Sequence, residues 1–242
     1  MKYLVLKFAG PLQSWGSNSK YTSQRRTDLF PTKSGVVGLL AASLGIERSN
    51  VDGLQKSGLL DLNIAVREDL KGKLLSDYQI IEVDNGNKKI SNKSYIADAI
   101  YLVAVYGNDN LIELLLHSVK NPKFTLFLGR KACVPEFDVA QVVVEYESVE
   151  QLLKTYPILT DKNRFNKIQR NQLELTLNIV KPATGTSGGS MVMDEPVSFA
   201  SAKRIHHPRM VEYTTVTISN PYYIPSVKIE AHDPFDIIEK EK

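Results

Sequence analysis

The sequence predicts an α+β protein, and two observations support this. Between residues 2 and 128 the hydrophobic patterns follow the order strand, helix, strand, strand, helix, strand. That order is the ferredoxin-like arrangement, which is also used by RNA-recognition modules. Between the second and third strands lies a polar stretch centred on Asn85-Gly86, a strong signal for a β-hairpin. We therefore expect a ferredoxin-like domain with an inserted hairpin.

The four strands of this domain are predicted from alternating or continuous apolar residues. Lys2–Ala9 alternates, which indicates a half-buried strand, and Leu62–Glu68 alternates in the same way. Ile100–Tyr106 is apolar on both faces, as expected of a central strand. Phe124–Leu128 is predicted as the fourth strand.

The first helix is predicted over Thr32–Leu44, within a stretch that organises the chain around it. The hydroxyls of Thr32 and Ser34 suit the start of a helix, and Gly45 suits its end. Its Val, Leu and Ala residues face all directions, so the helix should be buried on more than one side. The second helix is predicted over Asp109–Val119.

The inserted hairpin has two arms, Leu74–Val83 and Lys88–Ile96, which are polar for their length. Because two isolated strands are marginally stable in water, a hairpin that buries little of itself is expected to project and to bind a partner. A hairpin that folds back on the domain is the alternative.

The C-terminal part is predicted to be rich in β-structure and to pack on the first part. We place the first domain at residues 1–135, with the hairpin at about 74–96, and the C-terminal part at 136–242. No flexible linker separates them. The expected elements are strands at Val139–Tyr146, Leu173–Val180 and Val211–Ile218, with a helix opened by a capping box at Ser148–Gln151.

Composition limits the class of protein. The chain has 242 residues with 43% apolar content and a single cysteine, which fits a globular protein in a reducing compartment. No stretch has the ~20 apolar residues that a membrane span requires, so we expect a cytoplasmic protein without a membrane partner.

Positive charge is concentrated locally although the net charge is only +3. Residues 2–33 contain six basic residues and one acid. Such patches on a nearly neutral chain indicate a phosphate-bearing partner. Two further groups lie at Lys162, Arg164, Lys167 and Arg170 and at Lys203, Arg204 and Arg209.

Catalytic chemistry is weakly indicated. His206, His207, Tyr213 and Lys203 are the candidates for metal-independent, general acid–base cleavage of RNA. Cys133 lacks a recognisable partner and is expected to be a small buried residue. Asp194-Glu195 is expected in a turn beside Pro196, without forming a paired-carboxylate site. We expect no catalytic residues, no metal site and no cofactor.

The only tryptophan, Trp15, lies in the loop Gly10–Gly16, directly after the first strand. A tryptophan in this position could cover the hydrophobic core. It could equally stack on a nucleobase, with Gln13 and Ser14 hydrogen-bonding to base edges or phosphates. Both interpretations remain open at this stage.

Several motifs together resemble a known family. They are Gly10-Pro-Leu-Gln-Ser-Trp-Gly16, the stretch Phe30–Gly45, Asp98–Val105, Leu126-Phe-Leu-Gly-Arg-Lys-Ala-Cys-Val-Pro135 and Asp194–Phe199. They resemble the CasD family, whose members bind the 5′ handle of the guide RNA in the type I-E CRISPR Cascade complex. The resemblance spans residues 1 to about 215.

The resemblance implies a RAMP-type, non-catalytic, RNA-binding subunit in antiviral defence. It would grip the 5′ handle of the crRNA and cap the backbone subunits with its hairpin, the thumb of the family. Its partners would be the backbone subunit CasC and the large subunit CasA, with target DNA reached only through the complex. A homologue in a sister subtype cuts RNA, so an endoribonuclease that processes CRISPR repeat RNA is the alternative.

The resemblance also implies which residues contact the handle. They come from the tryptophan loop, the start of the first helix, the motif near residue 130 and the third basic group. The expected RNA-binding residues are Gln13, Ser14, Trp15, Gly16, Arg25, Arg26, Lys33, Ser34, Gly35, Arg130, Lys131 and Arg204.

Overall fold

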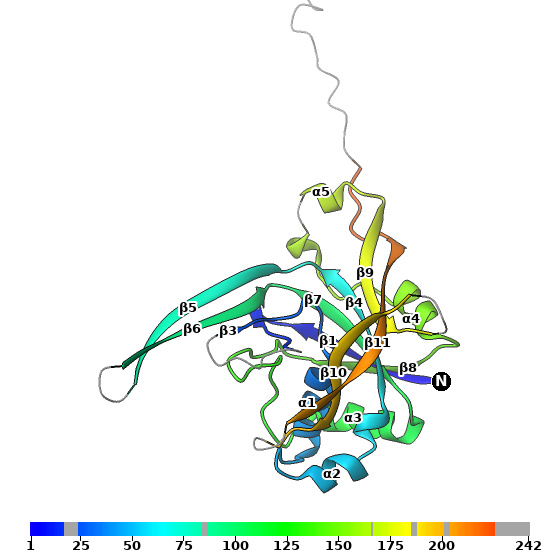
Figure 1. Cartoon of the computed structure of the whole chain (residues 1–242). Coiled ribbons are helices and arrows are strands. Elements are labelled where there is room, and N and C mark those ends of the chain that lie inside the picture. Colours follow the sequence, from blue (N-terminus) through cyan, green and yellow to red (C-terminus); the bar gives the residue numbers. More distant parts are fainter. Residues whose placement is uncertain (17–23, 84–86, 166, 185–187, 201–203, 226–242) are drawn as a thin grey trace, which may run out of the picture.

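The computed structural model describes residues 1–16, 24–83, 87–165, 167–184, 188–200 and 204–225. It is a mixed α+β protein whose body is one seven-stranded antiparallel sheet (Figure 1). In spatial order the strands are β10 (Ser190–Ser198), β11 (Ile205–Ser219), β9 (Glu174–Pro182), β4 (Asn63–Leu70), β7 (Ile100–Tyr106), β1 (Lys2–Ala9) and β8 (Ala140–Glu145).

Helices cover both faces of this sheet. Leu4, Leu6 and Phe8 of β1 point into a core shared with α1 (Lys33–Leu44) and α3 (Asp109–Lys120). Tyr3 and Val5 point to the opposite face, which α4 (Val149–Thr155) covers. The strand period of two therefore sends successive side chains into two different cores. The shorter helices are α2 (Val51–Lys56), η1 (Leu59–Asp61), η3 (Lys162–Arg164) and α5 (Lys167–Arg170).

Helix α1 has the ends that its sequence predicts. The hydroxyl of Thr32 accepts a hydrogen bond of 3.2 Å from the Gly35 N–H, and Gly45 ends the helix in the left-handed conformation at φ 76°. The helix packs against α3 on one side and β10 on another, which explains why its apolar residues are not confined to one face. Within the described part of the chain, no helix is long and apolar enough to cross a membrane.

The inserted hairpin consists of β5 (Lys73–Val83) and β6 (Asn87–Ala97), and Figure 1 shows it extending away from the body of the protein. Its predicted turn at residues 84–86 lies outside the described residues. The root of the hairpin is part of the fold, because β6 also pairs with β2 (Leu12–Gln13) and β3 (Gln24–Arg25). Only the outer portion is therefore free of the body.

The prediction of a fourth strand at Phe124–Leu128 was wrong. Leu126 and Leu128 are buried, so the apolar alternation is real. The backbone, however, is engaged elsewhere: the Phe124 N–H donates to the Ala42 carbonyl at the end of α1, and the Leu128 N–H donates to the Cys133 carbonyl. The place beside β1 is taken instead by β8.

Asp194, Glu195 and Pro196 were also expected in a turn, and they lie instead in β10. This strand is at the edge of the sheet, where a proline removes no ladder hydrogen bond. Its pairing with β11 is interrupted by register shifts between Val192 and Glu195 and between Pro196 and Ser198. The segment that was predicted as a turn is therefore an irregular edge strand.

A buried ion pair joins β4 to the segment after α4. The side chains of Arg67 and Asp69 are fully buried, and the Arg67 Nη2 atom donates to Asp69 Oδ2 at 3.0 Å. The Asp69 carboxylate also accepts from the Leu159 N–H at 2.7 Å. The remaining guanidinium donors bind the carbonyls of Leu153, Tyr156 and Pro157. The pair is thus fully satisfied, which is the condition for a charge to be tolerated in a core.

Replacing Asp69 with Asn should lower the free energy of unfolding by about 3–5 kcal/mol, because the Arg67 charge would stay buried without its counter-charge. Urea denaturation followed by circular dichroism measures this loss. Glu150→Gln is the control: it removes the partner of Lys181 in a pair whose carboxylate is half exposed, so the loss should stay below about 1 kcal/mol. Equal losses in both variants would contradict a special role for the Arg67–Asp69 pair.

Candidate nucleic-acid interface

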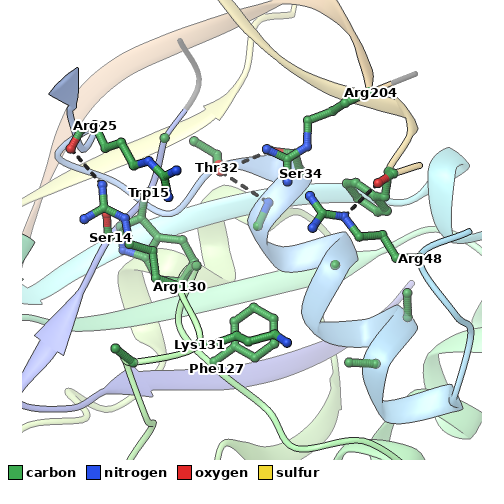
Figure 2. Close-up of a pocket in the computed structure, with 18 of the residues that line it drawn as sticks. Ser14, Trp15, Arg25, Thr32, Ser34, Arg48, Phe127, Arg130, Lys131 and Arg204 are labelled. Atoms are coloured by element: carbon green, nitrogen blue, oxygen red, sulfur yellow. Dashed lines mark hydrogen bonds between the residues drawn. The ribbon is translucent and has the colours of Figure 1, made fainter. Parts of the chain in front are cut away.

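One large cavity, of about 1260 Å³, opens between the start of α1, the root of the hairpin and the loop that contains residues 127–132. Figure 2 shows basic side chains pointing into it from several of these segments. Glu47 is the one acidic residue among the described residues that line it. The basic residues that line it are Arg25, Arg26, Arg48, Lys93, Arg130, Lys131 and Arg204. An anionic ligand is therefore the chemistry that this cavity favours.

Arg130 connects three of the segments around the cavity. Its guanidinium donates to the Ser94 carbonyl at 3.2 Å and to the Arg25 carbonyl at 2.7 Å, the second of which is drawn in Figure 2. The guanidinium carbon also lies 4.7 Å from the centre of the Tyr95 ring, a cation–π contact. Arg130 therefore fixes the hairpin root and β3 against its own loop while it adds positive charge to the cavity.

Trp15 covers the core. Its indole is 1% exposed and stacks on Phe8, with ring centroids 5.4 Å apart and planes 11° apart. The other face lies close to Gly35, where a Cβ atom would come within 2.9 Å of Trp15 Cε3. Both faces are thus covered, and base stacking by Trp15 is incompatible with this geometry. The absence of a side chain at Gly35 lets the Trp15 ring pack against the start of α1.

Gln13 and Ser14 are buried and bonded within the protein. The Gln13 amide donates to the Ala99 carbonyl at 2.8 Å and accepts from the Trp15 Nε1–H at 3.2 Å. The Ser14 hydroxyl donates to the Ser94 carbonyl at 3.2 Å. Ser14 and Trp15 line the floor of the cavity, and Gly16 is exposed at its wall. The tryptophan loop therefore forms part of the cavity surface, but its polar side chains are already hydrogen-bonded within the protein.

The N-terminus of α1, which was expected to bind RNA phosphate together with Lys33, is already occupied by carboxylates of the protein itself. The Lys33 N–H donates to Asp194 Oδ2 at 2.7 Å. The Lys33 ammonium lies 2.5 Å from Glu195 Oε1, and the residue is only 6% exposed. Asp194 is held in turn by Arg209, whose Nε and Nη2 atoms donate at 2.6 and 2.9 Å. Lys33 is consequently neutralised within the fold.

The remaining predicted residues line the cavity. Arg25, Arg26 and Lys131 are exposed and line the cavity. Ser34 lines it as well, with its hydroxyl 3.3 Å from that of Thr32. Arg204 lines the opposite end of the cavity in Figure 2. Sequence reasoning missed Arg48, Lys93 and Tyr95, which carry no motif and reach the cavity only through the tertiary fold.

Of the three candidates for acid–base chemistry that the structure describes, His206 alone lines this cavity. Burial lowers the pKa of the His206 imidazole and Arg204 lowers it further, while Asp194 opposes the shift, so the ring is neutral at pH 7. Tyr213 packs its edge on Phe30 beside a separate, smaller cavity. His207 is exposed outside the cavity, and Lys203 lies outside the described residues.

Cys133 and a metal site are the other chemical possibilities. Cys133 is fully buried, and burial raises the pKa of its thiol, which keeps it protonated and unreactive. In the part of the chain that the structure describes, no three His, Cys, Asp or Glu residues gather as metal ligands would.

The fold and the cavity define an α+β protein with an open, cation-lined surface, and comparison with known proteins identifies its family. The family described as "CRISPR-associated protein (Cas_Cas5)" matches residues 3–212. The chain therefore belongs to the CRISPR-associated Cas5 family.

Individual relatives agree with this assignment. The chain is 31% identical over 159 residues to the CRISPR system Cascade subunit CasD of Escherichia coli (strain K12), a match covering 54% of this chain and 66% of that relative. A crystal structure of a Cas protein is 32% identical with a TM-score of 0.65, covering 88% of this chain and 94% of the other. A chain of a CRISPR RNA-guided surveillance complex shares the fold at 23% identity and a TM-score of 0.69, covering 93% and 95%. The resemblance to CasD inferred from the motifs is confirmed.

Replacing Trp15 with Ala should lower the free energy of unfolding by about 3–5 kcal/mol, because it removes a fully buried aromatic side chain between Phe8 and Gly35. Urea denaturation followed by circular dichroism measures the effect. Lys131→Ala, on the same cavity but exposed, should change the stability by no more than about 0.5 kcal/mol. An undiminished stability of the Trp15 variant, combined with weaker RNA binding, would instead favour base stacking.

Proposed function

We propose that this chain is a non-catalytic RNA-binding subunit of a CRISPR Cascade complex, which holds the 5′ handle of the crRNA in the cavity. The observation that carries the proposal is the set of seven basic residues against one acid that line this cavity, on a chain with a net charge of only +3. The similarity to the Cascade subunit CasD supplies the biological context.

The contacts available in the cavity suit a single RNA strand. Arg25, Arg26 and Lys131 are exposed cations for backbone phosphates. Tyr95 and Phe127 are two of the aromatic residues that line the cavity, and we assign them the stacking on bases. Trp15, Gln13 and Lys33 support the surface from within. In this assignment they position the binding residues and do not touch the RNA.

The arrangement of strands supports a ferredoxin-like, RAMP-type core. At the end of the sheet that β8 forms, the order is β8, β1, β7, β4, all antiparallel, and α1 and α3 pack on the same face. We propose that these elements form the ferredoxin-like unit, with the fourth strand supplied by Ala140–Glu145. The remaining strands β9, β11 and β10 extend the same sheet and form the β-rich C-terminal part.

The outer hairpin is proposed to contact the backbone subunit CasC as the thumb of the family. Tyr78, Ile80 and Ile90 are all more than half exposed, and Ile80 pairs directly with Ile90. Exposed apolar side chains on an isolated hairpin indicate a surface that a partner covers. A contact with CasA, access to target DNA only through the complex, and a cytoplasmic location remain predictions.

The alternative function, a metal-independent endoribonuclease for CRISPR repeat RNA, depends on His206. Its neutral imidazole lines the same cavity as the basic residues, as a general base would. The other proposed partners, His207 and Tyr213, do not line this cavity. We therefore favour binding without cleavage.

Replacing residues 79–90 with a short Gly-Ser turn should abolish assembly with the backbone subunit but leave the body folded. The cut lies beyond the Tyr78–Asn92 pair, so the strand pairs of the root with β2 and β3 remain. Size-exclusion chromatography of co-expressed subunits and a thermal melt measure the two effects. Ile80→Ser/Ile90→Ser tests the apolar contact with the hairpin intact. Assembly at the wild-type level in both variants would show that the hairpin does not contribute to the interface with the backbone subunit.

Changing both Arg25 and Arg26 to Ala should flatten the salt dependence of handle-RNA affinity. Each phosphate contact on a single strand contributes about −0.7 to the slope of log affinity against log salt, so two contacts change it by about 1.4. Fluorescence anisotropy with a repeat-derived RNA, in EDTA, measures the slope. A gel of the same samples should show intact RNA.

The matched control is Lys120→Ala/Lys154→Ala, which removes two exposed charges on α3 and α4 and should leave the slope unchanged. An unchanged slope in the Arg25/Arg26 variant would show that this loop is merely solvated. RNA cleavage that disappears in His206→Ala would establish the endoribonuclease alternative instead.

A further inference from the structure

Arg48 and Arg204 lie together at the end of the cavity away from Arg25 and Arg130. Both line the cavity, and Figure 2 shows Thr32, at the start of α1, between the two groups. The two arginines come from distant segments: Arg48 follows the end of α1, and Arg204 precedes β11. No motif in the sequence brings them together.

Arg48 is held in place by the chain segment that leads to Arg204. Its Nε atom donates to the Phe199 carbonyl at 2.7 Å, a bond drawn in Figure 2. This bond uses one of the five guanidinium N–H groups and orients the plane of the group. The two terminal amino groups of Arg48 make no hydrogen bond to any residue that the structure describes.

Arg204 has no hydrogen-bond or ion-pair partner within the described ranges. Partial burial lowers the pKa of the Arg204 guanidinium, and the positive charge of Arg48 lowers it further. The two guanidinium groups therefore lie close enough to repel each other. The acids nearby do not neutralise them: Asp194 and Glu195 are engaged by Arg209 and Lys33. Glu47 lines the cavity but forms no ion pair with either arginine.

Two like charges held side by side without a counter-ion repel each other, and an anion between them relieves the repulsion. The guanidinium fork matches phosphate oxygens in a bidentate manner, which distinguishes a pair of arginines from a pair of lysines. The neighbouring His206 imidazole, neutral at pH 7, adds a polar group beside them without adding charge.

We propose that Arg48 and Arg204 together form one phosphate-binding site, separate from the Arg25 and Arg26 contacts, which grips a single phosphate of the bound RNA. This proposal rests on the function proposed above, because it assigns a second anchor to the same RNA strand. The strand would then run past the start of α1 from one group of arginines to the other. The phosphate is either an internal phosphodiester or a 5′-terminal phosphate.

The test compares the salt dependence of RNA affinity for the full chain and for Arg48→Gln, Arg204→Gln and the double variant. If the two arginines share one phosphate, the double variant should flatten the slope of log affinity against log salt by about 0.7. A shared phosphate also predicts that either single change leaves most of the slope in place, because the remaining arginine still neutralises the same phosphate. Fluorescence anisotropy with repeat-derived RNA carrying a 5′-hydroxyl or a 5′-phosphate distinguishes the two sources. An effect with both RNAs indicates a phosphodiester, and an effect with the phosphorylated RNA alone indicates the terminal group.

Two controls separate binding from structure. Arg204→Lys keeps the charge and should keep most of the slope, whereas Lys120→Gln/Lys154→Gln should leave it unchanged. A thermal melt of the double variant should stay close to that of the wild type, because the relieved repulsion offsets the loss of the Arg48 hydrogen bond to the Phe199 carbonyl.

An unchanged slope in the double variant would overturn the proposal, while the Arg25/Arg26 effect would show that RNA binding itself still stands. Additive single effects that sum to about 1.4 would also overturn it, since they would mean two independent contacts. Absence of RNA binding by the wild-type chain would refute the proposed function and, with it, this site.

Discussion

The Asp194 carboxylate is the contact on which the cavity depends. It accepts hydrogen bonds from the first backbone amide of α1 and from both donors of Arg209, so it joins the first helix to an edge strand that follows 161 residues later. It is 2% exposed, and in a buried setting such charge-assisted bonds are strong and directional. The strand pair β10 and β11 is thereby held against α1, and the segment that carries Arg204 and His206 becomes a wall of the cavity.

The same contact determines which charges remain for a ligand. A helix N-terminus is a ready anion site, but here an internal carboxylate fills it and Glu195 neutralises Lys33. The free positive charge is displaced to the two sides of the helix start, where Arg25 lies on one side and Arg48 and Arg204 lie on the other (Figure 2). In the proposed function, this separation favours an extended strand over a single compact anion.

The hairpin combines two roles that its sequence does not distinguish. Its root supplies Lys93 and Tyr95 to the cavity and is locked by Arg130, whereas its outer part carries exposed apolar residues. A partner that covers the outer part of the hairpin would contact the same two strands whose root forms one wall of the proposed RNA site. Assembly and RNA binding are therefore physically connected through β6 in the proposed function.

The sequence by itself determined the local elements and the family. The hydroxyl cap at Thr32, the glycine at Gly45, the alternation in β1 and the continuous apolar run of β7 depend on neighbouring residues only, and the predicted bounds of those elements agree with the structure to within one residue. Tertiary structure decided whatever depends on long-range partners. Leu126 and Leu128 alternate like a strand, yet their segment closes the end of α1. Trp15 and Lys33 resembled RNA contacts, yet Phe8 and Glu195 satisfy them inside the fold. The pairing of Arg48 with Arg204 is invisible in the sequence, because 155 residues separate them and only the packing of β10 against α1 brings their segments together.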